Sequence, residues 1–167
     1  MPNHVDQDLF IRGNVNDLKL FIEVAKDKKN EEEVISADNF IPYPEEFAKA
    51  DDEAYEARLL GNHNIKDGFN HGGYEWCCEN WGTKWGIYSS SLKTSKLDNN
   101  VGKLKYNFQS AWDPAILIIE AMSKQFPKLT FKLKYYERGR GFKGIYKIKN
   151  LVVLENTQLE YGGKRGG

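Results

Sequence analysis

The sequence has no excess of charge of either sign. Its 24 lysines and arginines balance 24 aspartates and glutamates, so the formal net charge is zero. A neutral chain lacks the long-range field that draws a protein toward nucleic acid or an anionic membrane. Any site for a polyanion must therefore come from a local gathering of cations.

Long apolar runs are also missing. No stretch approaches the roughly 20 apolar residues that a membrane span requires. The opening MPNHVDQDLF has neither the basic segment nor the apolar stretch of a secretory signal. We therefore expect a cytoplasmic protein without membrane contact. With 40% hydrophobic and 13% aromatic residues, the 167-residue chain is rich enough to fold as one domain.

Cysteine is scarce, and the chain has only Cys77 and Cys78. Neighbouring residues seldom reach the geometry of an ordinary disulfide, so we expect reduced thiols. A nucleophilic thiol needs a base or a positive environment, and His63 and His71 form no recognisable pairing with either cysteine. Their spacing also matches no paired-ligand zinc pattern. The sequence indicates no catalytic residue, no metal and no cofactor.

The first half of the chain alternates between strand and helix patterns. Residues 5–13 predict a strand, and a helix follows from Asn14 or Asn16, with an apolar stripe that includes Leu18 and Phe21. Residues 34–47 predict a short extended segment that ends in prolines. Residues 48–72 are polar and rich in glycine and asparagine, so we interpret them as an insertion with one helix and a loop.

The second half predicts a hairpin, a helix and more strands. Residues 85–92 and 104–112 form the hairpin, and Asp113 caps a helix that has Pro114 in its first turn. Residues 129–137 alternate between apolar residues and lysines, which gives this strand a basic outer face. RGRGF is a turn, and one or two strands follow within residues 143–155.

This order predicts an α+β fold of the ferredoxin-like type. Its elements form a split β-α-β layout, in which helices cover one face of an antiparallel sheet. We expect a single domain over residues 1–160, which includes the insertion at about 48–72. Residues 161–167, YGGKRGG, are expected to form a flexible tail.

Several motifs carry a resemblance to a known family. The chain contains LFIRG near its start, ENWGTKW at its centre, and AWDP and YYERGRGFKG later. In their order they resemble the YubB ferredoxin-like domain family, which occurs in phages, plasmids and prophages. The resemblance implies a ferredoxin-like fold and an origin in a mobile genetic element. It implies no established activity.

The segment YEWCCENWGTKWG, residues 74–86, holds three of the four tryptophans. If residues 74–81 are helical, Tyr74, Cys77, Cys78 and Trp81 share one stripe that would face the sheet. Gly82 would end this helix. Lys84 then lies between Trp81 and Trp85, and we expect Trp85 near Trp112 at the ends of neighbouring strands.

A cation between aromatic faces suits a flat, anionic ligand such as a nucleotide, because rings stack on the base while cations meet phosphate. Arginines beside a tyrosine offer the same chemistry in the RGRGF turn. The candidate ligand-binding residues are Glu79, Asn80, Trp81, Thr83, Lys84, Trp85, Trp112, Tyr136, Arg138 and Arg140. An equally open reading is that the Lys84 stem covers an aromatic core edge with its ammonium in water.

Three function classes follow. The first is a non-catalytic binding protein of a phage or other mobile element that sequesters a nucleotide-type small molecule or a host protein in counter-defence, within the host cytoplasm. The second is a single-stranded nucleic-acid binding module, for which Tyr106, Phe108 or Tyr135 would be exposed stacking platforms on the sheet. The third is an uncharacterised enzyme, for which no acid–base or nucleophile constellation is evident.

Overall fold

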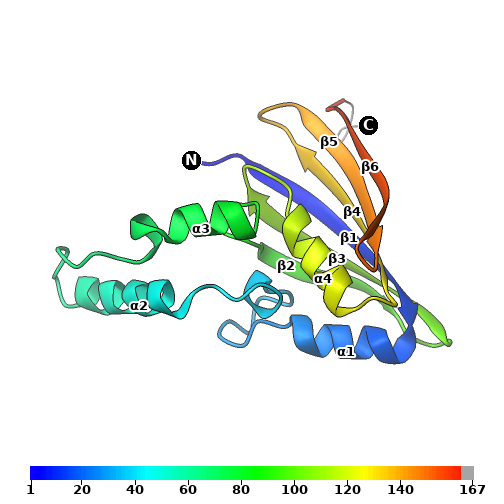
Figure 1. Ribbon diagram of the computed structural model, residues 1–167, viewed down its shortest axis with the longest axis horizontal. Coiled ribbons are helices and arrows are strands. Elements are labelled where there is room, and N and C mark those ends of the chain that lie inside the picture. Colours follow the sequence, from blue (N-terminus) through cyan, green and yellow to red (C-terminus); the bar gives the residue numbers. More distant parts are fainter. Residues whose placement is uncertain (163–167) are drawn as a thin grey trace.

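A computed structural model describes residues 1–162 and contains one six-stranded sheet with helices beside it (Figure 1). The strands are β1 (His4–Asn14), β2 (Tyr88–Lys96), β3 (Val101–Ala111), β4 (Thr130–Glu137), β5 (Phe142–Lys149) and β6 (Val152–Glu160). The helices are α1 (Val15–Ala25), α2 (Glu45–Leu59), α3 (Gly73–Asn80) and α4 (Ile116–Gln125), with 3-10 turns η1 (Ala37–Asn39) and η2 (Phe69–His71).

The sheet runs β2-β3-β1-β4-β5-β6, and every neighbouring pair is antiparallel. This confirms the predicted ferredoxin-like α+β fold. The predicted hairpin is β2–β3, and residues 143–155 belong to the two strands β5 and β6. β1 lies in the middle of the sheet, between β3 and β4.

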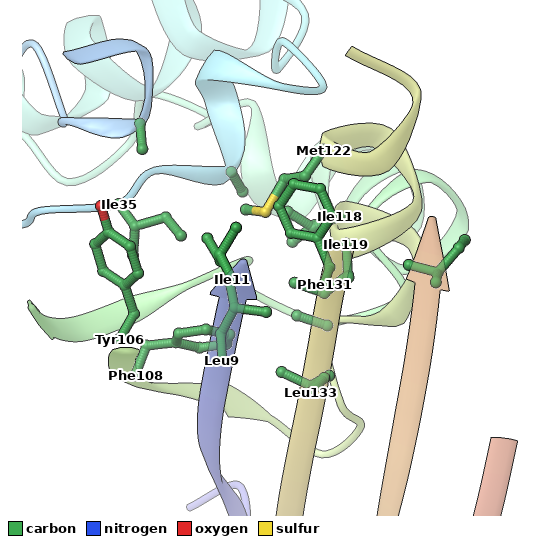
Figure 2. Close-up of a cluster of buried hydrophobic side chains, with 14 of the residues drawn as sticks. Leu9, Ile11, Ile35, Tyr106, Phe108, Ile118, Ile119, Met122, Phe131 and Leu133 are labelled. Carbon is green, nitrogen blue, oxygen red and sulfur yellow. The ribbon is translucent and has the colours of Figure 1, made fainter. Parts of the chain in front are cut away.

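The core lies between one face of the sheet and the helices α1 and α4 (Figure 2). Alternate residues of each strand point to this side, as a period of two requires. Full burial of such apolar side chains stabilises the fold by about 1.5–3 kcal/mol each. The labelled core residues are Leu9, Ile11, Ile35, Tyr106, Phe108, Ile118, Ile119, Met122, Phe131 and Leu133.

The aromatic residues that a nucleic-acid binding module would need as exposed platforms belong to this core. Tyr106, Phe108 and Tyr135 are at most 2% exposed, and burial raises the pKa of both tyrosines. Their parity placed them on the helix-covered face, where apolar burial outweighs any gain from exposure. The three rings therefore do not meet the condition that this function class set for them.

The two helices that cover the sheet begin in different ways. The Asn14 side chain accepts a hydrogen bond from the Asn16 amide at 2.9 Å, which confirms one of the predicted caps of α1. Asp113 does not cap α4, contrary to prediction. The N-cap residue is Ala115, whose amide donates to the buried Gln7 Oε1 at 3.0 Å, while the Asp113 carboxylate accepts from Arg140.

Residues 34–47 form no strand, contrary to prediction. The Ser36 amide donates to the Ala25 carbonyl at 2.9 Å, and the Asn39 side chain donates to the Lys26 carbonyl at 2.6 Å. The segment thus satisfies the terminal carbonyl groups of α1 and adds no strand to the sheet. α2 starts at Glu45, directly after Pro44, and projects to one side of the sheet (Figure 1).

The end of the described chain is held by the β4–β5 turn. The Tyr161 amide donates to the Gly141 carbonyl at 2.7 Å, and its hydroxyl accepts from Arg138 Nε at 3.2 Å. Tyr161 is therefore anchored, although it was assigned to the flexible tail. The rest of that tail, residues 163–167, lies outside the described residues.

Candidate functional site

The tryptophan-rich segment forms α3 and the bend that follows it. Trp81 closes the helix, and Gly82 adopts φ +70°, which confirms its predicted role after the helix end. Trp81 is only 8% exposed, and its indole Nε1 donates to the Ile41 carbonyl at 2.9 Å. Its ring contacts Trp76 at 5.3 Å between centroids.

The predicted apolar stripe of α3 is only partly correct. Cys77 and Trp81 are buried, whereas Tyr74 and Cys78 are exposed. α3 contacts η2 and lies beside the sheet (Figure 1), so its buried face is narrower than that of a helix lying on a sheet. Trp81 and Cys77 are thus core residues.

Three other candidate residues lie in or next to this bend, namely Glu79, Asn80 and Thr83. Thr83 is 2% exposed, and its hydroxyl accepts from the Gly86 amide at 2.8 Å. The Asn80 side chain donates to the Trp76 carbonyl at 2.9 Å. These bonds close the bend, so Thr83 is not accessible to a ligand. Glu79 is exposed on the surface of α3.

Lys84 lies between two aromatic rings, but they are Tyr74 and Trp85, and Trp81 is not one of them. Its Nζ is 4.7 Å from the centroid of Trp85 and 5.8 Å from that of Tyr74. Trp85 is 41% exposed and packs edge-on against Tyr88 with 6.1 Å between centroids. Trp85 therefore packs on a residue of β2, and its expected proximity to Trp112 stays a prediction.

An open hollow of about 690 Å³ adjoins this bend. Trp81 and Trp85 line it together with Tyr43, and the loop after α1 adds Lys28 and Lys29. Lys84 is not part of its wall. The tryptophans therefore do border a concavity, and the cations that face it come from a segment other than the predicted one.

The two arginines of the RGRGF turn are exposed, but both form hydrogen bonds with other groups of the protein. Arg140 donates to the Trp112 carbonyl and to Asp113 Oδ1, the latter at 2.8 Å, and these bonds raise its pKa. The buried Glu137 carboxylate accepts from the Gly139 and Arg140 amides at 2.6 Å each. The arrangement fixes the β4–β5 turn against the end of β3. A phosphate would have to displace these bonds.

The strongest concentration of charge lies elsewhere, on the sheet face opposite α1 and α4. A hollow of about 650 Å³ there is lined by Phe10 and by cations from four strands. We call these cations with the adjoining Lys105 the basic patch. Its members are Arg12 of β1, Lys103 and Lys105 of β3, Lys132 and Lys134 of β4, and Lys147 of β5.

The register of the sheet places like charges directly opposite one another. Lys103 faces Arg12 on β1 and Lys96 on β2, and Lys132 faces Lys147 on β5. Like charges at such positions are destabilising. Within residues 1–162, no carboxylate forms an ion pair with Arg12, Lys132 or Lys147. Acids also belong to these ladders, since Glu155 of β6 faces Lys147 and Asp8 of β1 faces Lys134. In the part of the chain that the structure describes, no acid faces Arg12, Lys103 or Lys96, so the repulsion among these three is the part that the ladders leave unbalanced.

Phe10 occupies the centre of this patch. In the two ladders of β1 it faces Lys105 on one side and Lys132 on the other. The ammonium groups of Lys105 and Lys134 lie 5.3 and 5.8 Å from its ring centroid. Lys105 also approaches the buried Asp8 carboxylate at 4.0 Å. The patch therefore combines an aromatic ring with several flexible cations.

The basic outer face of residues 129–137 is visible in the sequence, but alternation alone gives it no role. The signal was the i, i+2 spacing of Lys132 and Lys134, repeated by Lys103 and Lys105. Only the strand order brings both pairs beside Phe10. The zero net charge of the whole chain hid this local excess.

The described residues offer little to metal or thiol chemistry. No three His, Cys, Asp or Glu side chains among them gather closely enough to hold a metal ion. Burial, with a smaller effect of the neighbouring Cys78, raises the pKa of Cys77 to about 12, so this thiol is not activated. None of the helices in residues 1–162 is long and apolar enough to cross a membrane.

Comparisons with known proteins agree with the fold. A family model described as a ferredoxin-like domain in Api92-like protein matches residues 84–164, which span β2 to β6. The crystal structure of protein api92 from Yersinia pseudotuberculosis is similar with a TM-score of 0.59 at 10% identity, over 98% of this chain and 99% of that one. None of the curated proteins matches the chain. The chain therefore has a ferredoxin-like fold of the kind found in api92.

Proposed function

We propose that the chain is a non-catalytic protein that binds single-stranded nucleic acid on the open face of its sheet. The observation that carries the proposal is the gathering of cations around Phe10, in which Arg12 and Lys96 both face Lys103 and no acid faces any of these three in the ladders of the described residues. A bound phosphate backbone would relieve this repulsion, because each phosphate replaces a neighbouring cation as the nearest charge.

A half-buried aromatic residue on a basic sheet favours a single strand over a duplex. Unpaired bases can stack on an aromatic side chain, whereas the bases of a duplex are already stacked on one another. Phe10 lies on the central strand, with cations on both sides at the distance of a cation–π contact. The lysine stems are flexible, so their ammonium groups can move from the ring to phosphates when a base arrives.

The test is fluorescence anisotropy with a labelled single-stranded oligonucleotide of mixed sequence. The variant Lys132→Gln/Lys147→Gln removes two patch cations that oppose each other. The control Lys19→Gln/Lys124→Gln changes the net charge equally on the exposed surfaces of α1 and α4. We expect the patch variant alone to lose affinity and to lower the slope of log K against log salt by about 1.4, roughly 0.7 for each lost contact.

The same patch variant separates a binding role from a structural one. Lys147 faces Glu155 as well as Lys132, so the variant loses a repulsion and an attraction together, and the thermal unfolding temperature should change little while binding falls. An equal loss of affinity in both variants, or binding that does not respond to salt, would overturn the proposal. A duplex of the same length serves as the comparison ligand and should bind more weakly.

A second candidate is a nucleotide-type small molecule in the hollow beside Trp85. It is favoured by the exposed Trp85 ring, which could stack on a base, and by Lys28 and Lys29 in the same wall. Asp27, Asp38 and Glu45 also line this hollow and oppose an anionic ligand, so the candidate ranks second. A nucleotide panel should then raise the unfolding temperature of the wild type, and Trp85→Ala should abolish the rise. This variant should leave oligonucleotide binding unchanged, since Trp85 lies outside the basic patch.

The resemblance to the YubB ferredoxin-like family supplies the biological setting of the proposal. The chain would act in a phage or plasmid, inside the host cytoplasm, where sequestration of a nucleotide ligand or a host protein would oppose host defence. Affinity capture from infected host cells tests this setting. Recovery of nucleic acid by the wild type but not by Lys132→Gln/Lys147→Gln would support the basic patch as the working surface.

A further inference from the structure

The two edges of the sheet differ in their protection against pairing. β2, at one edge, carries Lys93 and Lys96, and two irregularities interrupt its register with β3. Lysines and bulges are the usual devices that keep an edge strand from pairing with another chain. β6, at the other edge, contains neither lysine nor proline, and its only irregularity lies near its start.

The side chains of β6 are unusually apolar for an exposed edge strand. Val152, Val153, Leu154 and Leu159 are each about half exposed or more. Nothing in residues 1–162 pairs with the outer side of this strand. β6 therefore offers free backbone donors and acceptors together with apolar surface, which are the features of a strand-pairing edge.

We infer that β6 pairs antiparallel with β6 of a second copy of this chain. A two-fold axis at Thr157 places Thr157 opposite itself, Asn156 opposite Gln158, and Glu155 opposite Leu159. This register brings no two acids together, and Thr–Thr and amide pairs are favourable across strands. The regular part of β6, from Glu155 to Glu160, lies beyond the irregularity and so remains free for this pairing.

The symmetry of such a pair has a consequence for the open face. Antiparallel strands in one sheet are related by a two-fold axis perpendicular to that sheet, so both copies present the same face. A hollow on this face runs from Lys134 past Tyr136 and Lys143 to Thr157 and Leu159 at the edge. The second copy would continue it, and two basic patches would share one surface.

Dimer formation itself does not depend on the proposed function, but the use of the dimer as a longer surface for a single strand rests on that function.

The test of dimer formation is sedimentation equilibrium across a concentration series. The variant Asn156→Glu/Gln158→Glu places acids opposite acids twice at the predicted interface and should weaken the dimer about tenfold. Asn156→Lys/Gln158→Glu places opposite charges there and should restore it. Both positions are exposed and lie on the sheet face away from the basic patch.

The outcomes are distinct. A wild type that stays monomeric at every concentration, or a charge-swapped variant that dimerises no better than the all-acid variant, would overturn the β6 pairing. A dimer that binds no oligonucleotide would keep this inference and reject the proposed function. If the dimer forms and also binds nucleic acid, an oligonucleotide long enough to reach both basic patches should bind the wild-type dimer more tightly than it binds the all-acid variant. An oligonucleotide of half that length should bind the two proteins equally well.

Discussion

The ring of Phe10 faces Lys105 across the β1–β3 ladder, with 5.3 Å between the ammonium nitrogen and the ring centroid. An exposed cation–π contact of this kind contributes only about 0.5–1 kcal/mol. The apolar side chains of β1 that support the fold, Leu9 and Ile11, point to the other face. Phe10 is half-buried on the face opposite this core, and the proposed base stacking would use the part of its ring that solvent reaches.

We expect Phe10→Leu to weaken binding of a single-stranded oligonucleotide by roughly five- to a hundredfold, because stacking of one base on an aromatic ring contributes about 1–3 kcal/mol. Leucine keeps the apolar volume, so the unfolding temperature should change little. Anisotropy titrations measure the effect, and Leu20→Ala on the exposed surface of α1 is the control. Unchanged affinity in Phe10→Leu would show that the ring does not contact a base.

The two tryptophans that flank Lys84 in the sequence should respond differently to truncation. Trp81 is buried and donates to the Ile41 carbonyl, so Trp81→Ala should lower the free energy of unfolding by about 3–5 kcal/mol. Trp85 is 41% exposed, and Trp85→Ala should cost less than about 1 kcal/mol. Urea unfolding measures both. Similar losses would mean that Trp85 belongs to the core after all.

The fold could be predicted because its signals are local. Alternation in residues 104–112 and 129–137, and the apolar stripe of α4, each require only a short window of sequence. The errors came from tertiary partners. Ser36 and Asn39 bind carbonyl groups at the end of α1, so residues 34–47 could not become a strand.

The candidate site was harder to predict because its residues are also placed by tertiary contacts. Lys84 does lie among aromatic rings, but its partner Tyr74 was assigned to the core side of α3. The arginines of the RGRGF turn were candidates for an anion site, yet Arg140 forms ion pairs with Asp113 and Glu137. The basic patch needs the pairing of β1 with both β3 and β4, which no periodicity reveals.

The adjacent thiols should differ sharply in reactivity. Cys77 is buried with a pKa raised to about 12, whereas Cys78 is exposed. Because the thiolate is the reactive form, iodoacetamide at neutral pH should modify Cys78 alone in the folded protein. Intact mass spectrometry should find one adduct, and a second only after denaturation. Rapid double modification of the folded chain would contradict the burial of Cys77.

The loop after α2 should be sensitive to acid through Asp67. This carboxylate accepts from the Asn70 amide at 2.7 Å, from the Asn70 side chain at 3.0 Å and from Arg58 at 2.8 Å, and these bonds lower its pKa. Because the pKa of Asp67 is lower in the folded state than in the unfolded chain, the charged carboxylate stabilises the fold at pH values above the unfolded pKa of about 3.9. This stabilisation is lost as the pH falls through the pKa of the folded state.

Asp67→Asn should therefore reduce the free energy of unfolding at pH 7, by less than about 1 kcal/mol because Arg58 is solvent-exposed. The difference between the two proteins should shrink once the pH falls below about 3.9. Urea unfolding at several pH values measures it, and Asp52→Asn on the exposed side of α2 should show no such trend. A difference that stayed constant down to the lowest pH would contradict this prediction. Protonation of Asp67 would then have no effect on stability, so the loop would depend on the shape of residue 67 and not on its charge.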